Sequence, residues 1–372
     1  MTKAAELAKM GEVLTNNQIG GRRNIIINGA MQVAQRSTSV TGLGATAGYY
    51  TLDRFKMGLV GTAGRFTMTQ TADGPSGFAN CLKLDCTTVD TSIAATEQCK
   101  IEYRMEGQDV QQIKKGTSDA EKVTVSFYVK GNAAATYTCE VQDTDNTRYN
   151  GQEFSVTTSW TRIILTFAAD TTGALNDDNA LSFLLNFWLH AGSNFTGGSH
   201  TDNVWHTTAN QRVGDNQTSF FDSTDRTFFI TGLQMEVGSV ATPFEHRSFG
   251  EELHLCKRYY QKLVELNNSA YIMGGGYQNN TQFQGVIRFH PPMRDEPSLI
   301  SATTSSNNTA SAYAVDTNDT TDFIDTIAMH EPEPEAALIY TTGNTSGTKG
   351  QSGQLRIATA SNVPETAVSS EL

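Results

Sequence analysis

The sequence predicts an all-β protein with a short N-terminal helix, a two-sheet β-sandwich and a second, smaller C-terminal β domain. Its composition is one reason, because 32 glycines and only 18% charged residues favour short strands and turns over helical bundles. Alternation of apolar and polar residues is another, clearest in residues 123–130 (VTVSFYVK), whose odd positions should face one core. Such segments recur roughly every 8–20 residues, a spacing typical of sandwiches.

The first segment, residues 1–22, is predicted to be a helix followed by a flexible connector. Residues 2–14 (TKAAELAKMGEVL) contain good helix formers, and Thr2 can cap them. Leu7, Met10 and Leu14 fall on one side of this helix. A helix this short is marginal alone, so we expect these side chains to pack against another protein surface, with a frayed tail as the alternative.

The main β domain is predicted to span residues 23–247. Residues 25–27, three isoleucines, are typical of a strand buried on both faces, and the Ser/Thr/Gly-rich residues 37–48 are typical of a loop. Trp160 and Trp188 are expected in the core. Besides residues 123–130, strands are expected at residues 49–60, 65–70, 81–86, 100–105, 135–141, 153–156, 160–167, 181–190 and 227–237.

A joint is expected near residues 231–263, where the sandwich closes and a third domain, residues 248–372, begins. Pro243 breaks the last strand, and residues 251–260 are predicted to form an amphipathic linker helix that runs into a new strand. Residues 303–310 and 341–353 are polar loops of the kind on which recognition is often built. Further short strands are expected at residues 282–289, 297–303, 311–315, 322–329, 336–340 and 353–360, and the glycine triplet within residues 268–277 suggests a bulge or a tight backbone approach.

Charge and cysteine usage narrow the function classes. The net charge of −12 makes nucleic acid an unlikely partner, because an acidic chain repels phosphate. Neither an apolar run of membrane-spanning length nor a signal peptide is seen, so we expect synthesis in a cytoplasm without membrane insertion. The odd set of five cysteines lacks CxxC spacing and is predicted to be reduced and mostly buried in strands: Cys81, Cys86, Cys99, Cys139 and Cys256.

Sequence features for catalysis or metal binding are poor. GxSxG, HExxH and phosphate-cradling glycine motifs are missing, and the Glu/Pro run at residues 331–335 reads as an extended loop unsuited to paired catalytic carboxylates, so we do not expect an enzyme. His190, His200 and His206 come nearest to a zinc set, but surface histidines are the commoner explanation, and we predict no metal site. Residues 143–146 (DTDN) and 176–179 (NDDN) could ligate calcium, although turns use the same residues, so calcium is the only cofactor left open.

Four motifs give the chain a family resemblance. Residues 24–36 (NIIINGAMQVAQR), 50–55 (YTLDRF), 232–262 and 292–297 (PMRDEP) occur in an order that resembles tail-fibre and related structural proteins of tailed bacteriophages. The resemblance implies a virion protein, made in the host cytoplasm, that assembles as a homotrimer and contacts other virion proteins of the tail or capsid. It also implies oligomer contacts near the threefold axis by Leu253, Leu255, Tyr259 and Leu263.

A second resemblance concerns the sandwich. Residues 109–132, 154–167 and 228–238 resemble the jelly roll of carbohydrate-binding modules, with Met235 in place of the usual leucine. The resemblance supports a jelly-roll β-sandwich and, by analogy, host cell-surface polysaccharide as a partner. Residues 201–206 look like an exposed loop, which makes its tryptophan the favoured sugar platform. The aromatic candidates for glycan binding are Trp205, Tyr271, Tyr277 and Tyr313.

Together these features predict a non-enzymatic virion protein, a tail-fibre or receptor-binding subunit that attaches the particle to host surface glycans. Two alternatives stay open. A head-attached fibre or capsid decoration protein would share the same physics and differ only in its partner. A glycan-depolymerising tail enzyme would instead need catalytic acidic residues in a groove between subunits.

Overall fold

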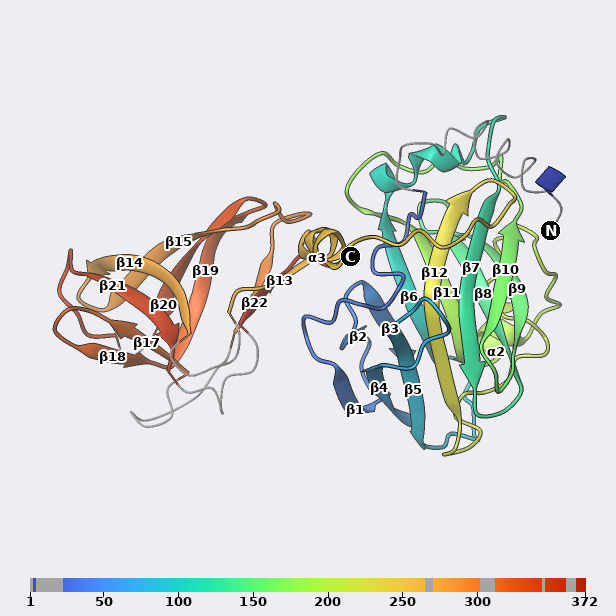
Figure 1. The fold of residues 1–372 in the computed structure, drawn as a ribbon, viewed down its shortest axis with the longest axis horizontal. Helices are drawn as coiled ribbons and strands as arrows, with labels where there is room; N and C mark the ends of the chain where they lie inside the picture. Colours follow the sequence, from blue (N-terminus) through green and yellow to red (C-terminus); the bar gives the residue numbers. More distant parts are fainter. Residues whose placement is uncertain (1–2, 5–22, 265–269, 302–311, 343–344, 359–365) are drawn as a thin grey trace. The chain divides into compact units, whose positions relative to one another are not determined.

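The computed structural model describes residues 3–4, 23–264, 270–301, 312–342, 345–358 and 366–372 (Figure 1). It divides the chain into two compact units, residues 1–252 with Leu372 and residues 253–371, so the division falls inside helix α3 (Phe249–Lys257). Both units are built almost entirely from antiparallel strands, which confirms the all-β prediction. Apart from residues 3–4, the predicted N-terminal helix, with Leu7, Met10 and Leu14, lies outside the described residues.

The first unit is a sandwich of two six-stranded sheets, and its layers are visible in Figure 1. Most of the expected strands form with bounds within a few residues of those predicted, but residues 49–60, expected to be one strand, are divided into two strands by residues 50–54. Sheet A has the order β1 (Ser39–Leu43), β4 (Arg65–Thr71), β5 (Cys81–Thr88), β12 (Thr227–Val237), β7 (Val123–Gly131) and β10 (Thr161–Phe167). Sheet B has the order β2 (Gly48–Tyr49), β3 (Phe55–Val60), β6 (Gln98–Glu106), β11 (Leu181–Ala191), β8 (Ala135–Asp143) and β9 (Arg148–Val156).

Aromatic side chains join the two sheets across the core. The ring of Phe127 on β7 lies 4.9 Å from Phe187 on β11 and 5.1 Å from Phe154 on β9, both edge to face. Such edge-to-face pairs stabilise a core beyond the area that they bury. The odd positions of residues 123–130 are buried, as the alternation predicted. Trp188 is fully buried, whereas Trp160 is only half-buried and packs on Phe229, so its assignment to the core was wrong.

Two local predictions near the N-terminus were wrong. Residues 25–27 form no strand of their own, because Asn28 adopts the left-handed conformation (φ 62°) and turns the chain directly after them. Ile25 instead donates its N–H to the Met235 carbonyl (3.0 Å). Residues 37–48, predicted to be a loop, contain the edge strand β1. Pairing with β4 outweighs the weak strand propensity of its Ser/Thr/Gly sequence.

The first phage-like motif is a turn locked by one asparagine. The Asn28 amide donates to the carbonyls of Val33 (2.8 Å) and Asp53 (3.0 Å), and its oxygen accepts the N–H groups of Gln32 and Val33 (both 2.9 Å). At Gly29 a Cβ atom would lie 2.1 Å from the Leu233 carbonyl oxygen, so only glycine fits. The Asn-Gly pair therefore has a structural cause.

The other motifs of the first unit bind to the same network. Asp53 accepts the Gln35 N–H (3.1 Å), which ties the second motif to the end of the first. Arg247, from the third motif, donates to the Ile26 carbonyl (3.1 Å) and to Glu252 (2.9 Å). These motif side chains thus stabilise the fold through hydrogen bonds within the chain.

The second unit has a seven-stranded and a three-stranded antiparallel sheet. Its core contains Phe283, Tyr313 and Ile339. The larger sheet has the order β18 (Thr321–Ile324), β17 (Tyr313–Asp316), β21 (Ser352–Ile357), β14 (Tyr271–Asn279), β15 (Gln282–Arg288), β20 (Ala336–Thr342) and β19 (Thr326–Glu333). The smaller sheet has the order β13 (Tyr260–Lys262), β22 (Ala367–Ser369) and β16 (Ser298–Ile300).

Sequence reasoning was less accurate in this unit. The strand expected at residues 322–329 is split into β18 and β19 at Asp325. The Glu/Pro run at residues 331–335 is not an extended loop, because β19 continues to Glu333 and turns directly into β20. Residues 303–310 lie outside the described part of the chain. The PMR motif is structural, since Met293 is buried and Arg294 donates its backbone N–H to the Arg258 carbonyl (2.7 Å).

Two predictions from composition can be compared with the structure. All five cysteines are buried, and none forms a disulfide. Four of them lie in strands and Cys256 lies in α3, in agreement with the prediction of mostly strand-buried thiols. Among the described residues, none of the helices has the length and apolar character needed to cross a membrane.

Candidate functional site

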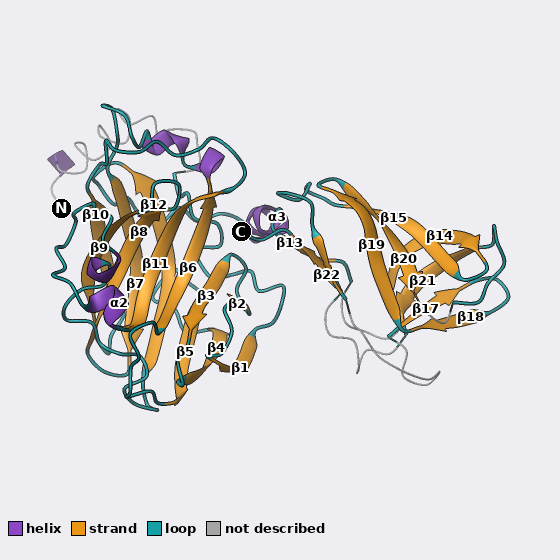
Figure 2. Cartoon of the chain, turned by 180° about the vertical axis from the view of Figure 1, so that it is seen from behind, coloured by secondary structure: helices purple, strands orange, loops and turns teal. Residues whose placement is uncertain are grey.

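The candidate site lies on the outer face of sheet B, where the chain crosses back between β11 and β12. We call residues 192–220 the covering segment; it includes α2 (Ser193–Thr196) and η3 (Ala209–Gln211). Figure 2 shows α2 on the sheet B side of the sandwich. The segment is tied to the sheet by its backbone, since Thr218 donates to the Thr136 carbonyl and Phe220 to that of Leu189 (both 2.8 Å).

Beneath the covering segment lies a buried ionic group, the Glu140 cluster, formed by Glu140, Asn186, Trp188 and Arg212. Arg212 binds both carboxylate oxygens of Glu140, at 2.7 and 2.8 Å. The Trp188 indole N–H (3.0 Å) and the Asn186 amide (2.8 Å) donate to the same carboxylate. Because Glu140 alternates with inward-facing Cys139 and Val141 on β8, its side chain must point out of the sandwich.

Aromatic rings surround the cations of this region. The Arg212 guanidinium lies 4.1 Å from the Tyr149 ring centroid and 5.0 Å from that of Trp188. The Lys100 ammonium lies 4.7 Å from the Trp188 ring. Such cation–π contacts hold the indole in one orientation.

The pKa shifts in this region indicate which side chains are charged at neutral pH. Burial raises the pKa of the Glu140 carboxyl, but the charge and hydrogen bonds of Arg212 outweigh it, so that the pKa lies below its ordinary value. Burial lowers the pKa of Lys100, and the nearby Glu102 carboxylate only partly offsets this. Glu140 and Arg212 therefore form an ion pair at neutral pH. This pair is a rigid base for the covering segment.

Above this base lies a shallow groove of about 530 Å³, the Phe195 groove, lined by Ser193, Asn194, Phe195, Ala209 and Asn210. The Phe195 ring packs on Trp188 at a tilt, with centroids 5.0 Å apart and an interplanar angle of 40°. The side chains of Ser193, Asn194 and Asn210 make no hydrogen bond with any other described residue. The groove thus combines a supported aromatic ring with free amide and hydroxyl groups, which suits a ligand with both apolar C–H faces and hydroxyls.

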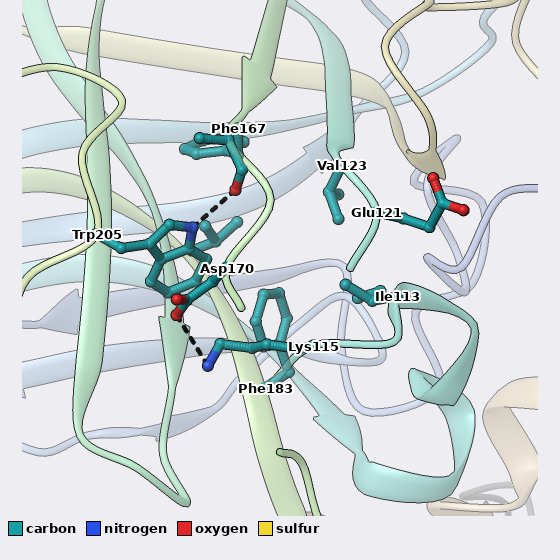
Figure 3. A pocket seen from close by; sticks show the side chains of 10 residues that line it. Ile113, Lys115, Glu121, Val123, Phe167, Asp170, Phe183 and Trp205 are labelled. Carbon is teal, nitrogen blue, oxygen red and sulfur yellow. Dashed lines mark hydrogen bonds and ion pairs between the residues drawn. The ribbon is translucent and has the colours of Figure 1, made fainter. Parts of the chain in front are cut away.

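Trp205, the favoured sugar platform from the sequence, has a structural place. Its indole N–H donates to the Ala168 carbonyl (2.7 Å), and its ring lies 6.4 Å from Phe183 and 5.2 Å from the Lys115 ammonium. Figure 3 shows these side chains around a cavity of about 10 Å³, room for one water at most. Trp205 is half-buried and closes one end of the core, so a role in glycan binding stays a prediction.

The three tyrosine candidates for glycan binding differ in how deeply their side chains are buried. Tyr271 is 55% exposed and keeps a free ring face. Tyr277 is 3% exposed and donates to Asp322 (3.1 Å), and burial together with that carboxylate raises its pKa. Tyr313 is fully buried, with its hydroxyl 3.1 Å from Thr366. Neither Tyr277 nor Tyr313 has a face for a sugar, so both assignments were wrong.

The residues predicted to contact other subunits also differ in how exposed their side chains are. Leu253, Leu255 and Leu263 are half-buried and retain surface for a neighbour. Tyr259 is 1% exposed in the single chain, so its ring has no surface to share between subunits and its assignment was wrong. The homotrimer itself stays a prediction.

The two segments proposed for calcium lie side by side, since Asn176 donates its N–H to Asp145 (2.9 Å). Asp143 is already neutralised, because the Lys115 ammonium lies 2.5 Å from its carboxylate and 3.0 Å from that of Asp170. The same ammonium donates to the carbonyls of Thr172 and Gly173 (2.8 and 3.0 Å), so it occupies an oxygen cage of the kind that a cation requires. Calcium binding stays a prediction.

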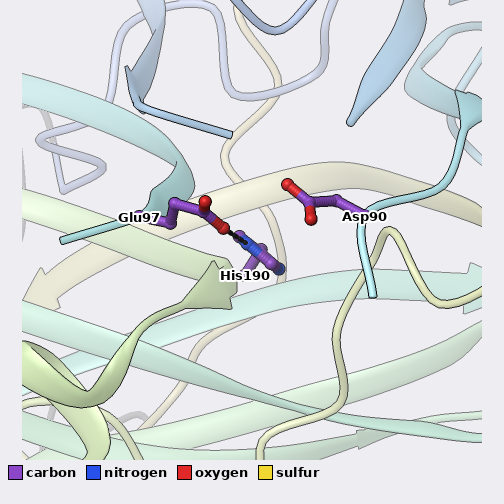
Figure 4. A group of neighbouring side chains, drawn as sticks. All are labelled: Asp90, Glu97 and His190. Atoms are coloured by element: carbon purple, nitrogen blue, oxygen red, sulfur yellow. Dashed lines mark hydrogen bonds and ion pairs between the residues drawn. The ribbon is translucent and has the colours of Figure 1, made fainter. Parts of the chain in front are cut away.

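The three histidines considered for zinc do not come together. The ring nitrogens of His200 lie 2.8 Å from the Gln211 carbonyl and 3.0 Å from Asp202, and the ring of His206 packs beside Tyr149. His190 instead lies with Asp90 and Glu97, as Figure 4 shows. Within the described ranges this is the only group of three or more His, Cys, Asp or Glu side chains close enough to hold one ion.

Sequence reasoning missed the Phe195 groove. Its lining comes from two short helical turns within a connection of more than thirty residues between β11 and β12. The available signal was this long segment rich in Asn, Ser and Gly, which pattern analysis read only as a loop. Pairing of Arg212 with Glu140 joins residues 72 positions apart, which no local pattern reveals.

One comparison with known proteins matches a segment that includes residues of this face. Residues 64–188 match the family model of a carbohydrate binding domain, a span that includes Glu140 and Trp188. No curated protein matches the chain.

Solved structures give only distant likenesses. The enzymatically active domain of tailspike protein 4 from bacteriophage CBA120 is 12% identical over 58% of this chain, with a TM-score of 0.31, and the match spans 21% of that chain. A family 11 carbohydrate-binding module from Clostridium thermocellum, in complex with a β-1,3-1,4-mixed-linked tetrasaccharide, is 8% identical over 55% of this chain and 99% of its own, with a TM-score of 0.27. TmCBM61 in complex with β-1,4-galactotriose is 8% identical over 58% of this chain and 99% of its own, with a TM-score of 0.30. Likenesses this distant carry no argument about function, and the family model of a carbohydrate binding domain matches residues 64–188, about a third of the chain.

Proposed function

We propose that this chain is a non-catalytic glycan-binding protein, and more specifically a bacteriophage tail-fibre or receptor-binding subunit that attaches the particle to host surface polysaccharide. Glycan binding is supported by the family match of residues 64–188 and by the Phe195 groove above them. The place in the virion is supported by the resemblance of residues 24–36, 50–55 and 232–262 to tail-fibre proteins.

The observation that carries the proposal is the composition of the groove. A sugar ring would stack its C–H face on Phe195, while Ser193, Asn194 and Asn210 would bind hydroxyl groups. Trp188 supports the phenyl ring from below, which limits the ordering that binding requires. A shallow site of this kind binds weakly, and several copies in a homotrimeric fibre would supply avidity.

The same lining argues for holding a glycan and against cleaving it. Glycoside hydrolysis uses two carboxyl groups roughly 5–10 Å apart across the scissile bond. None of the five residues that line the groove is acidic. Glu140, the carboxylate beneath it, is fully buried and bound by Arg212, so it is in no position to act on a sugar.

Retention of the full chain on immobilised polysaccharides tests the proposal. We expect a panel of bacterial surface polysaccharides to contain at least one that retains the wild type. Phe195→Ala should bind at least about tenfold more weakly, while Tyr271→Ala, which tests the exposed aromatic candidate in the other unit, should bind as the wild type does. Far-UV circular dichroism would establish that both variants fold.

The other outcomes of this experiment contradict the proposal. Failure to bind every member of the panel argues against a glycan-binding role. Loss of binding in Tyr271→Ala but not in Phe195→Ala would move the site to the second unit. Release of reducing ends from the polysaccharide would favour a depolymerase.

The virion assignment has a separate test. Antibodies against this chain, viewed on intact particles by electron microscopy, should label the tail fibres. Label on the head would favour a head-attached fibre or decoration protein, and unlabelled particles would exclude a virion protein.

A further inference from the structure

We infer that Asp90, Glu97 and His190 form a binding site for a divalent metal ion of the type that accepts imidazole and carboxylate together, such as Zn²⁺. One ligand atom from each side chain lies within 4.8 Å of the other two, and all three residues are buried. Figure 4 shows the three side chains meeting from different parts of the chain. This mixture of nitrogen and oxygen ligands is common in zinc sites.

The fold places the three residues with little freedom. Asp90 follows β5 of sheet A, Glu97 precedes β6 of sheet B, and His190 lies in β11. The pairing of β11 with β6 is irregular between Trp188 and His190, and a bulge of this kind changes the direction of a side chain. The Asp90 N–H is fixed by the Phe221 carbonyl (2.9 Å), and the Glu97 carbonyl accepts the Gly192 N–H (2.8 Å).

The ligand atoms are also oriented by neighbours. The Nδ1 atom of His190 lies 2.8 Å from the Ser219 hydroxyl, which directs Nε2 toward the Glu97 carboxylate at 3.3 Å. Asp90 uses only Oδ2 to accept from Thr62 (2.9 Å) and Ala63 (2.7 Å). Its Oδ1 atom makes no contact of this kind with any described residue. Support of a metal-binding histidine through its second nitrogen is the usual arrangement in metalloproteins.

Charge gives an independent reason for a cation. Asp90 and Glu97 are only 5% and 6% exposed, and neither forms an ion pair with a lysine or arginine in the described part of the chain. Even a protonated His190 would leave one negative charge buried, which is costly. By contrast, the buried carboxylates of Glu140 and Asp143 are paired with Arg212 and Lys115. A divalent ion would neutralise the two carboxylates of the site.

The metal would act as a clamp between the two sheets. Residues 89–97 connect sheet A to sheet B, and Asn194 of α2 donates its N–H to the Ala95 carbonyl of this connection (2.9 Å). Fixing the connection would therefore also fix the position of α2. With three protein ligands, water would complete the coordination.

Zinc titration of chelator-treated full-length protein tests the inference. We expect calorimetry to show one Zn²⁺ bound per chain, with affinity at least about tenfold lower in Glu97→Gln and His190→Gln. His200→Gln is the matched control, because His200 also pairs with a carboxylate, 3.0 Å away, but lies in the covering segment. Its affinity should equal that of the wild type.

A second measurement keeps the test decisive if a variant fails to fold. Zn²⁺ should raise the thermal midpoint of the wild type above its value in chelator, because a ligand that binds only the folded state stabilises it. Substitution by Co²⁺ should give visible bands without thiolate charge transfer, since the group of close ligand atoms contains Asp90, Glu97 and His190 and none of the five cysteines. Absence of stoichiometric binding, equal affinity in all variants or thiolate bands would each overturn the inference.

Discussion

At the scale of single residues, the Glu140 carboxylate controls the stability of the face that bears the groove. Its side chain has no exposed surface and is held by Arg212, Trp188 and Asn186. Removal of either member of a buried ion pair leaves the other uncompensated, which costs far more than removal of both.

Arg212→Leu should therefore lower the free energy of unfolding by about 3–5 kcal/mol. The double variant Glu140→Leu with Arg212→Leu should be closer to the wild type than this single variant, because no buried charge is left alone. Urea unfolding at neutral pH measures both differences. A single variant within about 1 kcal/mol of the wild type would contradict a buried ion pair.

The pH dependence of stability has a definite sign at this residue. Burial raises the pKa of Glu140, but Arg212 outweighs this, so the folded pKa lies below the ordinary value of 4.5. A carboxyl with a depressed folded pKa stabilises the protein above its unfolded pKa and loses that contribution as the pH falls through the folded pKa. Below pH 4.5 the wild type should lose stability faster than Glu140→Gln, which has no such group. Parallel curves from urea unfolding across this range would contradict the depressed pKa.

At the scale of elements, the turn after residues 25–27 connects the first motif, the Asp53 backbone and strand β12. Gly29 lies against the Leu233 carbonyl oxygen, where an added Cβ would be only 2.1 Å away. That oxygen belongs to β12 in the middle of sheet A, so it has no room to move.

Gly29→Ala should therefore destabilise the first unit by several kcal/mol, on the order of an overpacked core substitution or more. Gly250→Ala is the control, since nothing lies within 4 Å of its added Cβ. Thermal unfolding of both variants measures the difference. Equal midpoints for the two variants would show that the turn is not packed against β12 as described.

How much could be predicted from sequence also depends on the element. Strands such as β7 and β12 alternate clearly and are long, so pattern alone places them. β1 and β22 are short and held by partners distant in sequence, so their own residues carry little signal. Residues 25–27 look like a strand but end at the left-handed Asn28, which propensity does not register.

The candidate site was harder to predict than the strands. Aromatic type alone does not distinguish Tyr271, which is exposed, from Tyr313, which is buried in a sheet. Phe195 has no distinctive local sequence, and its role depends on packing against Trp188 after the covering segment has folded back. Residue types thus suggested a kind of ligand, whereas only the tertiary structure places the groove.

At the scale of the whole molecule, the proposed function requires several copies acting together. Sedimentation at micromolar concentration should give three times the mass of one chain. Glutamate at both Leu253 and Leu255 should shift the mass toward that of a monomer, because these half-buried side chains keep surface for a neighbour. Tyr271→Glu, an exposed change away from the predicted contact, should stay trimeric. A monomeric wild type would contradict the trimer and the avidity argument.

The affinity of a defined oligosaccharide, cut from a retained polysaccharide, tests the central claim most directly. Asn194 lines the Phe195 groove, and its amide is free for a ligand. Calorimetric titration should show one oligosaccharide per chain and a dissociation constant about 5–30-fold higher in Asn194→Ala, the loss expected for one or two hydrogen bonds. An unchanged dissociation constant in Asn194→Ala and in Phe195→Ala would contradict glycan binding at this groove.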